Sequence, residues 1–212
     1  MDSIIKNLLD GSIYTIEEVA KLAGVDVDYV LKIKEEDCYN DKEFVGDGSG
    51  VIYYMDIKYD TIVDGIGFRN TVYCAKCNMY CKGCHNKNSW NIRNGKPISV
   101  NNLARLLLEN GNDITFSGGE TSLQAKAFIS LAKIIKEHNK TIWLYSGYRY
   151  EELLNNESSK ELLKYVDVLV DGKFVEDLKD VDLLFKGSSN QRLIDIHRTI
   201  ECGKVVLWQE DD

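Results

Sequence analysis

The sequence has a single proline, Pro97, and no apolar run near the roughly 18 residues that a membrane-spanning helix needs. Its first residues, MDSIIKNLLDGS, lack the basic start and apolar core of a signal peptide. Basic residues are outnumbered by acidic ones, 26 to 34, and the resulting net charge of −8 argues against extensive nucleic-acid binding. The sequence also lacks internal repeats and low-complexity tracts. We therefore expect a cytoplasmic protein that does not associate with membranes.

Cysteine, in contrast, is plentiful, with six residues in a chain of 212. Thiols are kept reduced in the cytosol, so these cysteines are better explained as metal ligands or reactive thiols than as disulfides. The length suits one domain with a small appendage, and 44% hydrophobic and 28% charged residues are ordinary for a globular protein.

Residues 1–45 differ from the rest of the chain. The segment TIEEVAKLAGVDVDYVLKI has helical apolar spacing interrupted at Gly24, a pattern similar to a helix-turn-helix. Its charge is wrong for DNA, because residues 1–45 contain five lysines and eleven acidic residues, and Asp26 and Asp28 open the second helix. We predict a helical appendage over 1–45 that docks on the main domain or on a protein partner, a linker over 46–50 and the main domain over 51–212.

From Val51 onward, β-rich and amphipathic segments alternate, which predicts an α/β fold with parallel strands and right-handed crossovers. We predict helices over 99–110, 122–139 and 149–156, and strands over 51–57, 69–75, 113–119, 141–148, 166–172, 192–196 and 204–209. Glycine-containing turns end three of these strands, and a cysteine-rich loop follows a fourth. Because sites lie at the carboxyl ends of parallel strands, we expect these four segments to meet at one mouth.

Four cysteines fall within YCAKCNMYCKGCHN: Cys74, Cys77, Cys81 and Cys84. Structural zinc sites usually separate their two thiolate pairs by a dozen or more residues, whereas three residues separate the pairs here. Disulfide exchange at a CxxC would use one pair and ignore the other. An iron–sulfur cluster takes cysteine thiolates. Cys77-x3-Cys81-x2-Cys84 would supply three ligands and leave a fourth iron open to an exogenous ligand.

The C-x3-C-x2-C spacing is similar to the signature of radical S-adenosylmethionine (SAM) enzymes. Residues 64–99 resemble the cluster region of the activating proteins of anaerobic (class III) ribonucleoside-triphosphate reductase. FSGGETSLQ, IWLYSGYRYEEL and VDVLVDGKFVEDLKD resemble later segments of that family, and FKGSSNQRLID, residues 185–195, resembles a motif particular to it. The sequence departs from the family at Lys76, at Asn78-Met79 and at Cys74, and none of these is one of the three expected ligands.

The resemblance implies a partial (β/α) barrel of the radical SAM type and two cofactors, a [4Fe–4S] cluster and SAM. It assigns Cys77, Cys81 and Cys84 to three irons, with SAM chelating the fourth. Residues expected to contact SAM are Gly83, Cys84, His85, Gly118, Gly119, Glu120 and Ser146. Taken alone, Ser117-Gly118-Gly119-Glu120 is better explained as an ordinary helix-entry turn. Its expected place at the same sheet mouth as the cysteines favours a functional role. No side chain is assigned as catalytic, because the cluster and SAM carry the chemistry.

The family's activity is reductive cleavage of SAM to a 5′-deoxyadenosyl radical, which abstracts a hydrogen from one glycine of the reductase. The implied partners are anaerobic ribonucleoside-triphosphate reductase and a low-potential electron donor such as flavodoxin. Two alternatives remain open. One is a radical SAM activase of another glycyl radical enzyme, such as pyruvate formate-lyase. The other is a zinc- or thiol-based regulator that binds DNA through residues 1–45.

Overall fold

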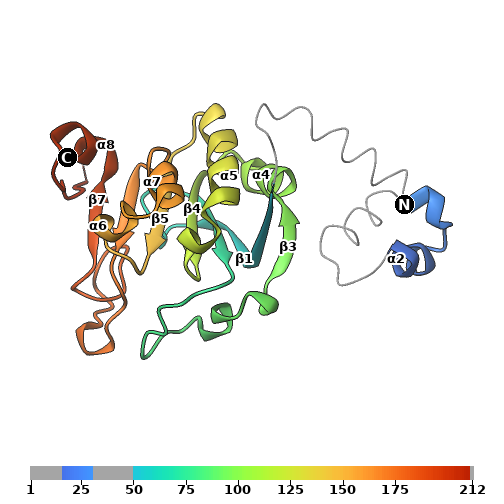
Figure 1. Ribbon diagram of the computed structural model, residues 1–212, viewed down its shortest axis with the longest axis horizontal. Coiled ribbons are helices and arrows are strands. Elements are labelled where there is room, and N and C mark those ends of the chain that lie inside the picture. The colour runs from blue at the N-terminus through green and yellow to red at the C-terminus, as the bar shows by residue number, and fades with distance from the viewer. Residues whose placement is uncertain (1–15, 31–49, 211–212) are drawn as a thin grey trace.

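A seven-stranded sheet forms the centre of the protein (Figure 1). The structure, a computed structural model, describes residues 16–30 and 50–210. The strands lie in the order β3-β1-β2-β4-β5-β6-β7. Their bounds are β1 Val51–Thr61, β2 Arg69–Cys74, β3 Lys96–Ser99, β4 Asp113–Gly118, β5 Ile142–Ser146, β6 Val168–Asp171 and β7 Arg192–Asp195.

The four central strands, β2, β4, β5 and β6, are parallel, whereas β1, β3 and β7 pair antiparallel to their neighbours. The α/β class is therefore confirmed, and parallel pairing is confined to the centre of the sheet. The outer connections explain the difference. A short loop joins β1 to β2, and residues 172–191 return the chain from β6 to β7 without an α-helix, so neither connection is a helical crossover.

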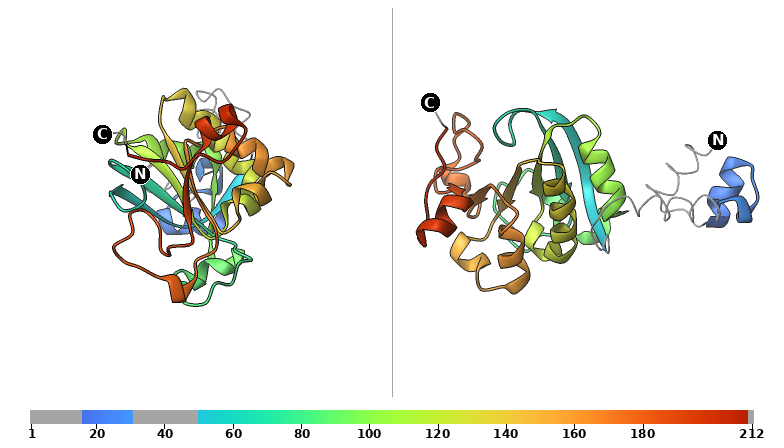
Figure 2. Two further views of the ribbon diagram at one scale, coloured as in Figure 1. Left: turned by 90° about the vertical axis from the view of Figure 1, so that its left-hand side faces the viewer. Right: turned by 90° about the horizontal axis from the view of Figure 1, so that it is seen from above.

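Helices α4, α5 and α7 pack together on one face of the sheet (Figures 1 and 2). Ser99 caps α4 by accepting a hydrogen bond from the Asn102 amide at 3.2 Å. The α-helices are α2 Ile16–Ala23, α4 Val100–Leu108, α5 Ala125–Glu137, α6 Tyr150–Leu153, α7 Glu157–Leu163 and α8 Ile196–Cys202, and the 3₁₀ helices are η2 Lys87–Trp90, η3 Ile92–Asn94, η4 Thr121–Gln124 and η5 Glu176–Leu178.

Strand β5 shows how the sheet is buried on both faces. Ile142 and Leu144 belong to the core beneath the helices, whereas Trp143 points to the other face, where its ring packs edge-on against Phe185 and Trp208. This alternation follows from the two-residue period of a strand. At β5, the face opposite these helices is therefore covered by aromatic side chains from the return segment and from the C-terminal residues.

Four elements differ from the sequence prediction. The strand expected over 204–209 is wrong as a regular strand, because it pairs with β7 at one isolated bridge, Leu207 with Ile194. Its backbone instead bonds irregularly, with the Val206 amide donating to Thr199 Oγ1 at 2.9 Å. Helices α7 and α8 and strand β3 were not predicted, since each is too short to show a clear hydrophobic period.

The N-terminal segment is described over 16–30. Helix α2 ends before Gly24, whose φ of +68° is left-handed, and residues 27–30 are helical. The Asp26 carboxylate accepts a hydrogen bond from the Tyr29 amide at 2.8 Å, so the acidic start of this second helix is confirmed. Predictions for 1–15 and 31–49, including most of the linker over 46–50, lie outside the described residues.

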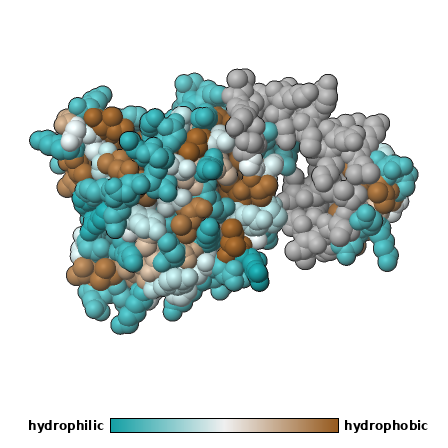
Figure 3. Space-filling view, viewed as in Figure 1, coloured by the Kyte–Doolittle hydropathy of each residue, from teal (hydrophilic) through white to brown (hydrophobic). Residues whose placement is uncertain are grey.

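Polar residues dominate the face shown in Figure 3, where apolar patches are small and separate. Across the described residues, none of the helices is both long enough and apolar enough to cross a bilayer.

Candidate functional site

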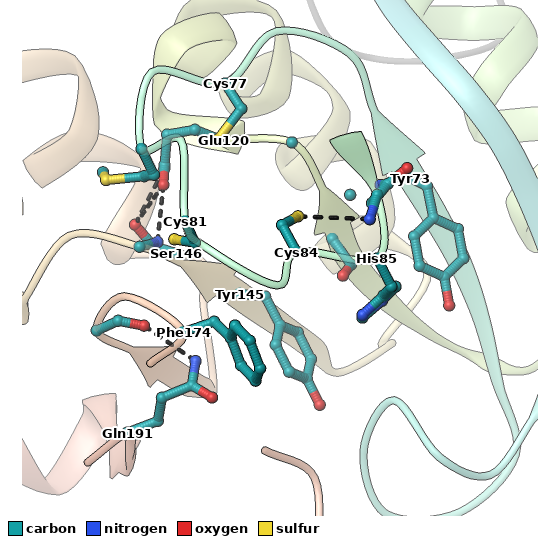
Figure 4. A pocket seen from close by; sticks show the side chains of 17 residues that line it. Tyr73, Cys77, Cys81, Cys84, His85, Glu120, Tyr145, Ser146, Phe174 and Gln191 are labelled. Carbon is teal, nitrogen blue, oxygen red and sulfur yellow. Dashed lines mark hydrogen bonds between the residues drawn. The ribbon is translucent and has the colours of Figure 1, made fainter. Parts of the chain in front are cut away.

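The carboxyl ends of β2, β4, β5 and β6 surround a pocket of about 170 Å³ (Figure 4). The predicted meeting of the cysteine loop with three strand-end turns is therefore confirmed. Seventeen residues line the pocket: Tyr73, Cys77, Met79, Cys81, Cys84, His85, Asn86, Ser117, Gly118, Gly119, Glu120, Tyr145, Ser146, Gly147, Gly172, Phe174 and Gln191.

Three of the four clustered cysteines line this pocket, and the fourth does not. Cys77, Cys81 and Cys84 are partly exposed free thiols, whereas Cys74 is fully buried in the core at the end of β2. Burial raises the pKa of Cys74 to about 12, and its sulfur lies 3.6 Å from Thr121 Oγ1. The structure thus separates Cys74 from the other three, as the C-x3-C-x2-C frame expects.

Backbone hydrogen bonds hold the loop that carries the three thiols. The Cys77 amide donates to the Trp90 carbonyl at 3.2 Å, and the Cys84 amide donates to the Cys81 carbonyl at 3.2 Å. The Asn86 amide points at the Cys84 sulfur, 3.4 Å away. These bonds fold the loop around the pocket.

The thiols that line the pocket are suited to hold an iron–sulfur cluster. Burial raises the pKa of Cys77 and of Cys81, opposed by hydrogen bonds from the backbone of Met79 and Phe174 respectively. Within residues 16–30 and 50–210, no three His, Cys, Asp or Glu side chains converge on one ion-sized point. A cluster does not require such convergence, because each thiolate binds a separate iron, and amides directed at sulfur are a usual feature of such sites. The donor set therefore fits an iron–sulfur cluster.

Gly118 and Gly119 line the pocket, and neither position has room for a side chain. A Cβ on Gly118 would lie 2.4 Å from the Cys74 nitrogen, and one on Gly119 would lie 2.4 Å from the Lys76 oxygen. Gly119 also donates its amide to the Cys74 carbonyl at 2.8 Å. The chain's own backbone therefore occupies the space that a side chain would need at either position.

Glu120 is completely buried at the end of β4 and faces the pocket. Its carboxylate accepts hydrogen bonds from the Ser122 amide at 3.1 Å, the Gly147 amide at 2.8 Å and the Ser146 hydroxyl at 3.0 Å. Burial raises the pKa of Glu120, and hydrogen bonds from Ser122, Gly147 and Ser146 oppose that rise. A buried carboxylate fixed by such donors is suited to receive a cationic group of a ligand.

Of the other residues expected to contact SAM, some line the pocket and one does not. Ser146 and His85 both line the pocket, Ser146 from the end of β5 and His85 from the cysteine loop. Gly83 is not among the lining residues. Its φ is +74°, and a Cβ there would meet the Glu176 carboxylate at 2.6 Å, so its position reflects packing of the loop.

Sequence reasoning assigned no site role to Phe174 and Gln191, which line the pocket from the segment between β6 and β7. Gln191 accepts hydrogen bonds from the Gly187 and Ser188 amides at 2.9 and 3.1 Å and donates to the Gly172 carbonyl at 2.9 Å. A Cβ at Gly187 would lie 3.1 Å from the Phe174 ring. The GSSNQ motif was the one sequence feature that pointed to this segment. Its position at the pocket could not be predicted, because it depends on the path of the chain between β6 and β7.

Comparison with known proteins agrees with this geometry. A family described as "4Fe-4S single cluster domain" matches residues 63–194. Three relatives share the name anaerobic ribonucleoside-triphosphate reductase-activating protein. The Salmonella typhi protein is 36% identical over 61% of this chain and 90% of its own length, and the Escherichia coli K12 protein is 34% identical over the same shares. The bacteriophage T4 protein is 35% identical over 65% of this chain and 93% of its own length.

The matches span nearly the whole of each relative. The family match over residues 63–194 contains the three thiols, the buried carboxylate and the return segment. The chain belongs to the 4Fe-4S single cluster domain family and, within it, to the anaerobic ribonucleoside-triphosphate reductase-activating proteins.

Proposed function

We propose that the chain is a radical SAM activase that generates a glycyl radical on anaerobic ribonucleoside-triphosphate reductase. The observation that carries this proposal is the joint placement of three free thiols and one buried carboxylate around a single pocket. Family membership adds the name of the reductase that the relatives activate.

In this proposal Cys77, Cys81 and Cys84 would hold a [4Fe–4S] cluster through their thiolates, and SAM would bind at the iron that has no protein ligand. Cys74 is not a ligand, because its thiol lies in the core. The lining of the pocket by Cys77, Cys81 and Cys84, and the amides near their sulfurs, support the assignment.

Glu120 positions SAM by accepting a hydrogen bond from its ammonium group. Ser146 and Gly147 restrict the carboxylate to one orientation, so little side-chain entropy remains to be lost when the ligand binds. Gly118 and Gly119 keep the β4 turn against the backbone of the cysteine loop, which fixes the separation between carboxylate and thiols. His85 and the adjoining loop border the adenosine side of the pocket.

When bound, the cluster and SAM supply a one-electron reductive cleavage that yields methionine and a 5′-deoxyadenosyl radical, which removes a hydrogen atom from the Cα of one glycine of the reductase. The chain's own contribution is to orient the two cofactors and to limit the access of water. Tyr73 and Tyr145 line the pocket. Their hydroxyls donate hydrogen bonds to the Asp64 carboxylate and to the Phe185 carbonyl, respectively.

We further infer that the sheet is a partial (β/α) barrel of the radical SAM type, supported by a pocket at the carboxyl ends of the parallel strands. We also propose a cytoplasmic location and a low-potential electron donor such as flavodoxin. The cytoplasmic location is supported by the three free thiols, because thiols stay reduced in the cytosol. The electron donor is inferred because cleavage of SAM consumes one electron.

The test is anaerobic reconstitution with iron and sulfide, followed by reduction with dithionite in the presence of SAM. We expect a reducible [4Fe–4S] signal, release of 5′-deoxyadenosine and, with the reductase added, a glycyl radical doublet in electron paramagnetic resonance (EPR). A zinc regulator would give neither signal nor cleavage. An activase of pyruvate formate-lyase would cleave SAM but leave the reductase without a radical.

A further inference from the structure

The segment between β6 and β7 exposes a short apolar surface beside the pocket. We call residues 175–184 the ridge. Four of its side chains are exposed although they are apolar: Val175 at 36%, Leu178 at 44%, Val181 at 83% and Leu184 at 66%. Single exposed apolar residues are ordinary, but four within ten consecutive residues form a patch of the kind that marks an interaction site.

Hydrogen bonds hold the first part of the ridge, residues 175–178, in shape. The Leu178 amide donates to the Val175 carbonyl at 3.0 Å within η5, and the Ser189 amide donates to the Leu178 carbonyl at 2.9 Å. The Val175 amide donates to Ser188 Oγ at 3.2 Å. A surface that is ordered before binding loses less conformational entropy on docking, so the ridge is suited to bind a partner.

The ridge is continuous with the pocket. Phe174, which precedes it, lines the pocket, and Glu176 forms an ion pair at 3.2 Å with Lys82 of the cysteine loop. Figure 1 and the left view of Figure 2 show the orange ridge segment and the green cysteine segment projecting from the same side of the sheet. A macromolecule seated on the ridge would therefore cover the mouth of the pocket.

The charges around the apolar residues restrict the partner further. The ridge contains four acidic residues, Glu176, Asp177, Asp180 and Asp182, and one lysine, Lys179. Lys82 partners Glu176, which leaves the other carboxylates on the ridge in excess over its single lysine. Complementary charge favours a partner segment that combines apolar side chains with Lys or Arg.

We propose that the ridge is the surface on which the reductase docks, through an apolar segment bordered by basic residues that brings its glycine to the pocket. This inference rests on the proposed function. It assigns to residues 175–184 a role in recognising the protein substrate and none in cleaving SAM.

The test is a pair of double variants that remove exposed apolar side chains at two places. Val181→Ser with Leu184→Ser changes the ridge. Ile62→Ser with Val63→Ser is the matched control, because these residues are 64% and 70% exposed in the loop before β2, at the end of the strand opposite to the cysteines. Binding of the reductase to each iron-free protein is measured by biolayer interferometry, and the rate of glycyl radical formation by EPR.

We expect the ridge variant to bind the reductase at least 10-fold more weakly and to lose a similar factor in radical formation at low reductase concentration. Cleavage of SAM without reductase should stay within about twofold of the unmodified protein, which also shows that the variant is folded. Equal binding by the ridge variant and the unmodified protein, or an equal loss in the control variant, would overturn the proposal.

A second experiment tests the charge of the partner segment. Asp177→Asn with Asp182→Asn keeps side-chain size and should reduce the dependence of reductase binding on salt concentration. An unchanged salt dependence would contradict a basic partner segment. The proposed function fails separately, because it requires the unmodified protein to cleave SAM and to form the radical.

Discussion

Ser146 donates its hydroxyl proton to the carboxylate of Glu120, with Oγ 3.0 and 3.1 Å from the two carboxylate oxygens. Ser146 is the last residue of β5, Glu120 follows the neighbouring parallel strand β4, and both residues are buried. The Gly147 amide reinforces the contact at 2.8 Å. One carboxylate is therefore fixed across two strand ends at the wall of the pocket.

Glu120→Gln should weaken SAM binding roughly 10- to 100-fold, because hydrogen bonds to charged groups contribute about 1.5–3 kcal/mol. The amide group of glutamine would also place donors against the Ser146 hydroxyl or the Gly147 amide. Equilibrium dialysis with labelled SAM measures the effect. Glu137→Gln, an exposed change at the end of α5, is the control. Unchanged affinity in the Glu120 variant would show that this carboxylate does not face the ligand.

Alkylation should separate the cysteines. In the iron-free protein at pH 8, iodoacetamide should modify Cys77, Cys81 and Cys84, which are accessible, and leave Cys74 unmodified. Burial shields the Cys74 thiol, and its pKa of about 12 keeps it protonated. Mass spectrometry of the digested protein gives the extent at each site, with exposed Cys202 as the internal standard. Modification of Cys74 as fast as Cys202 would contradict the structure.

The residues at the strand ends of the site could be predicted from the sequence, whereas the lining residues between β6 and β7 could not. Cys77, Glu120 and Ser146 each follow a strand with a clear hydrophobic pattern, so the parallel topology alone brought them to one edge. Phe174 and Gln191 could not be placed in this way, because residues 172–191 contain no regular α-helix or strand. Their position depends on side-chain bonds such as that from Gln191 to Gly172, which leave no periodic trace in sequence.

In the fold, too, the long elements could be predicted and the short ones could not. Helices α4 and α5 have long apolar faces and were predicted, whereas α7 and α8 have seven residues each and were not. Residues 204–209 have the β-branched composition of a strand, yet they make a single bridge to β7, formed by the Trp208 amide on the Leu193 carbonyl and the Asp195 amide on the Val206 carbonyl. The Val206 amide donates instead to the Thr199 hydroxyl, outside the sheet. Tertiary partners overrode local preference there.

Gln191→Leu should loosen the turn that closes the return segment. The variant removes two accepted hydrogen bonds and one donated bond, so we expect the free energy of unfolding to fall by roughly 2–4 kcal/mol, at about 1 kcal/mol per bond plus the cost of groups left unpaired. Urea denaturation measures the change, and limited proteolysis should report faster cleavage within residues 172–191. Gln209→Leu, at an exposed position, is the control and should leave both unchanged.

Acid should weaken the contact between Glu151 and Arg192. The hydrogen bond from Arg192 lowers the pKa of Glu151 below its ordinary 4.5, so on acidification the unfolded chain takes up this proton before the folded one. The stability from this group is thus complete above about pH 4.5 and is lost as the pH falls below it. Glu151→Gln should be less stable at pH 6 and should lose less stability between pH 6 and pH 4, as measured by urea denaturation of the iron-free protein. Parallel curves for the two proteins would exclude the contribution.

The measurement that tests the central claim most directly is the yield of 5′-deoxyadenosine from four reconstituted single variants, Cys74→Ala, Cys77→Ala, Cys81→Ala and Cys84→Ala, each reduced with dithionite under SAM. Far-ultraviolet circular dichroism confirms that each is folded. We predict that Cys74→Ala retains most of the cleavage and that the other three abolish it. Full cleavage by any of those three, or its loss in a folded Cys74→Ala protein, would contradict the assignment of the cluster ligands.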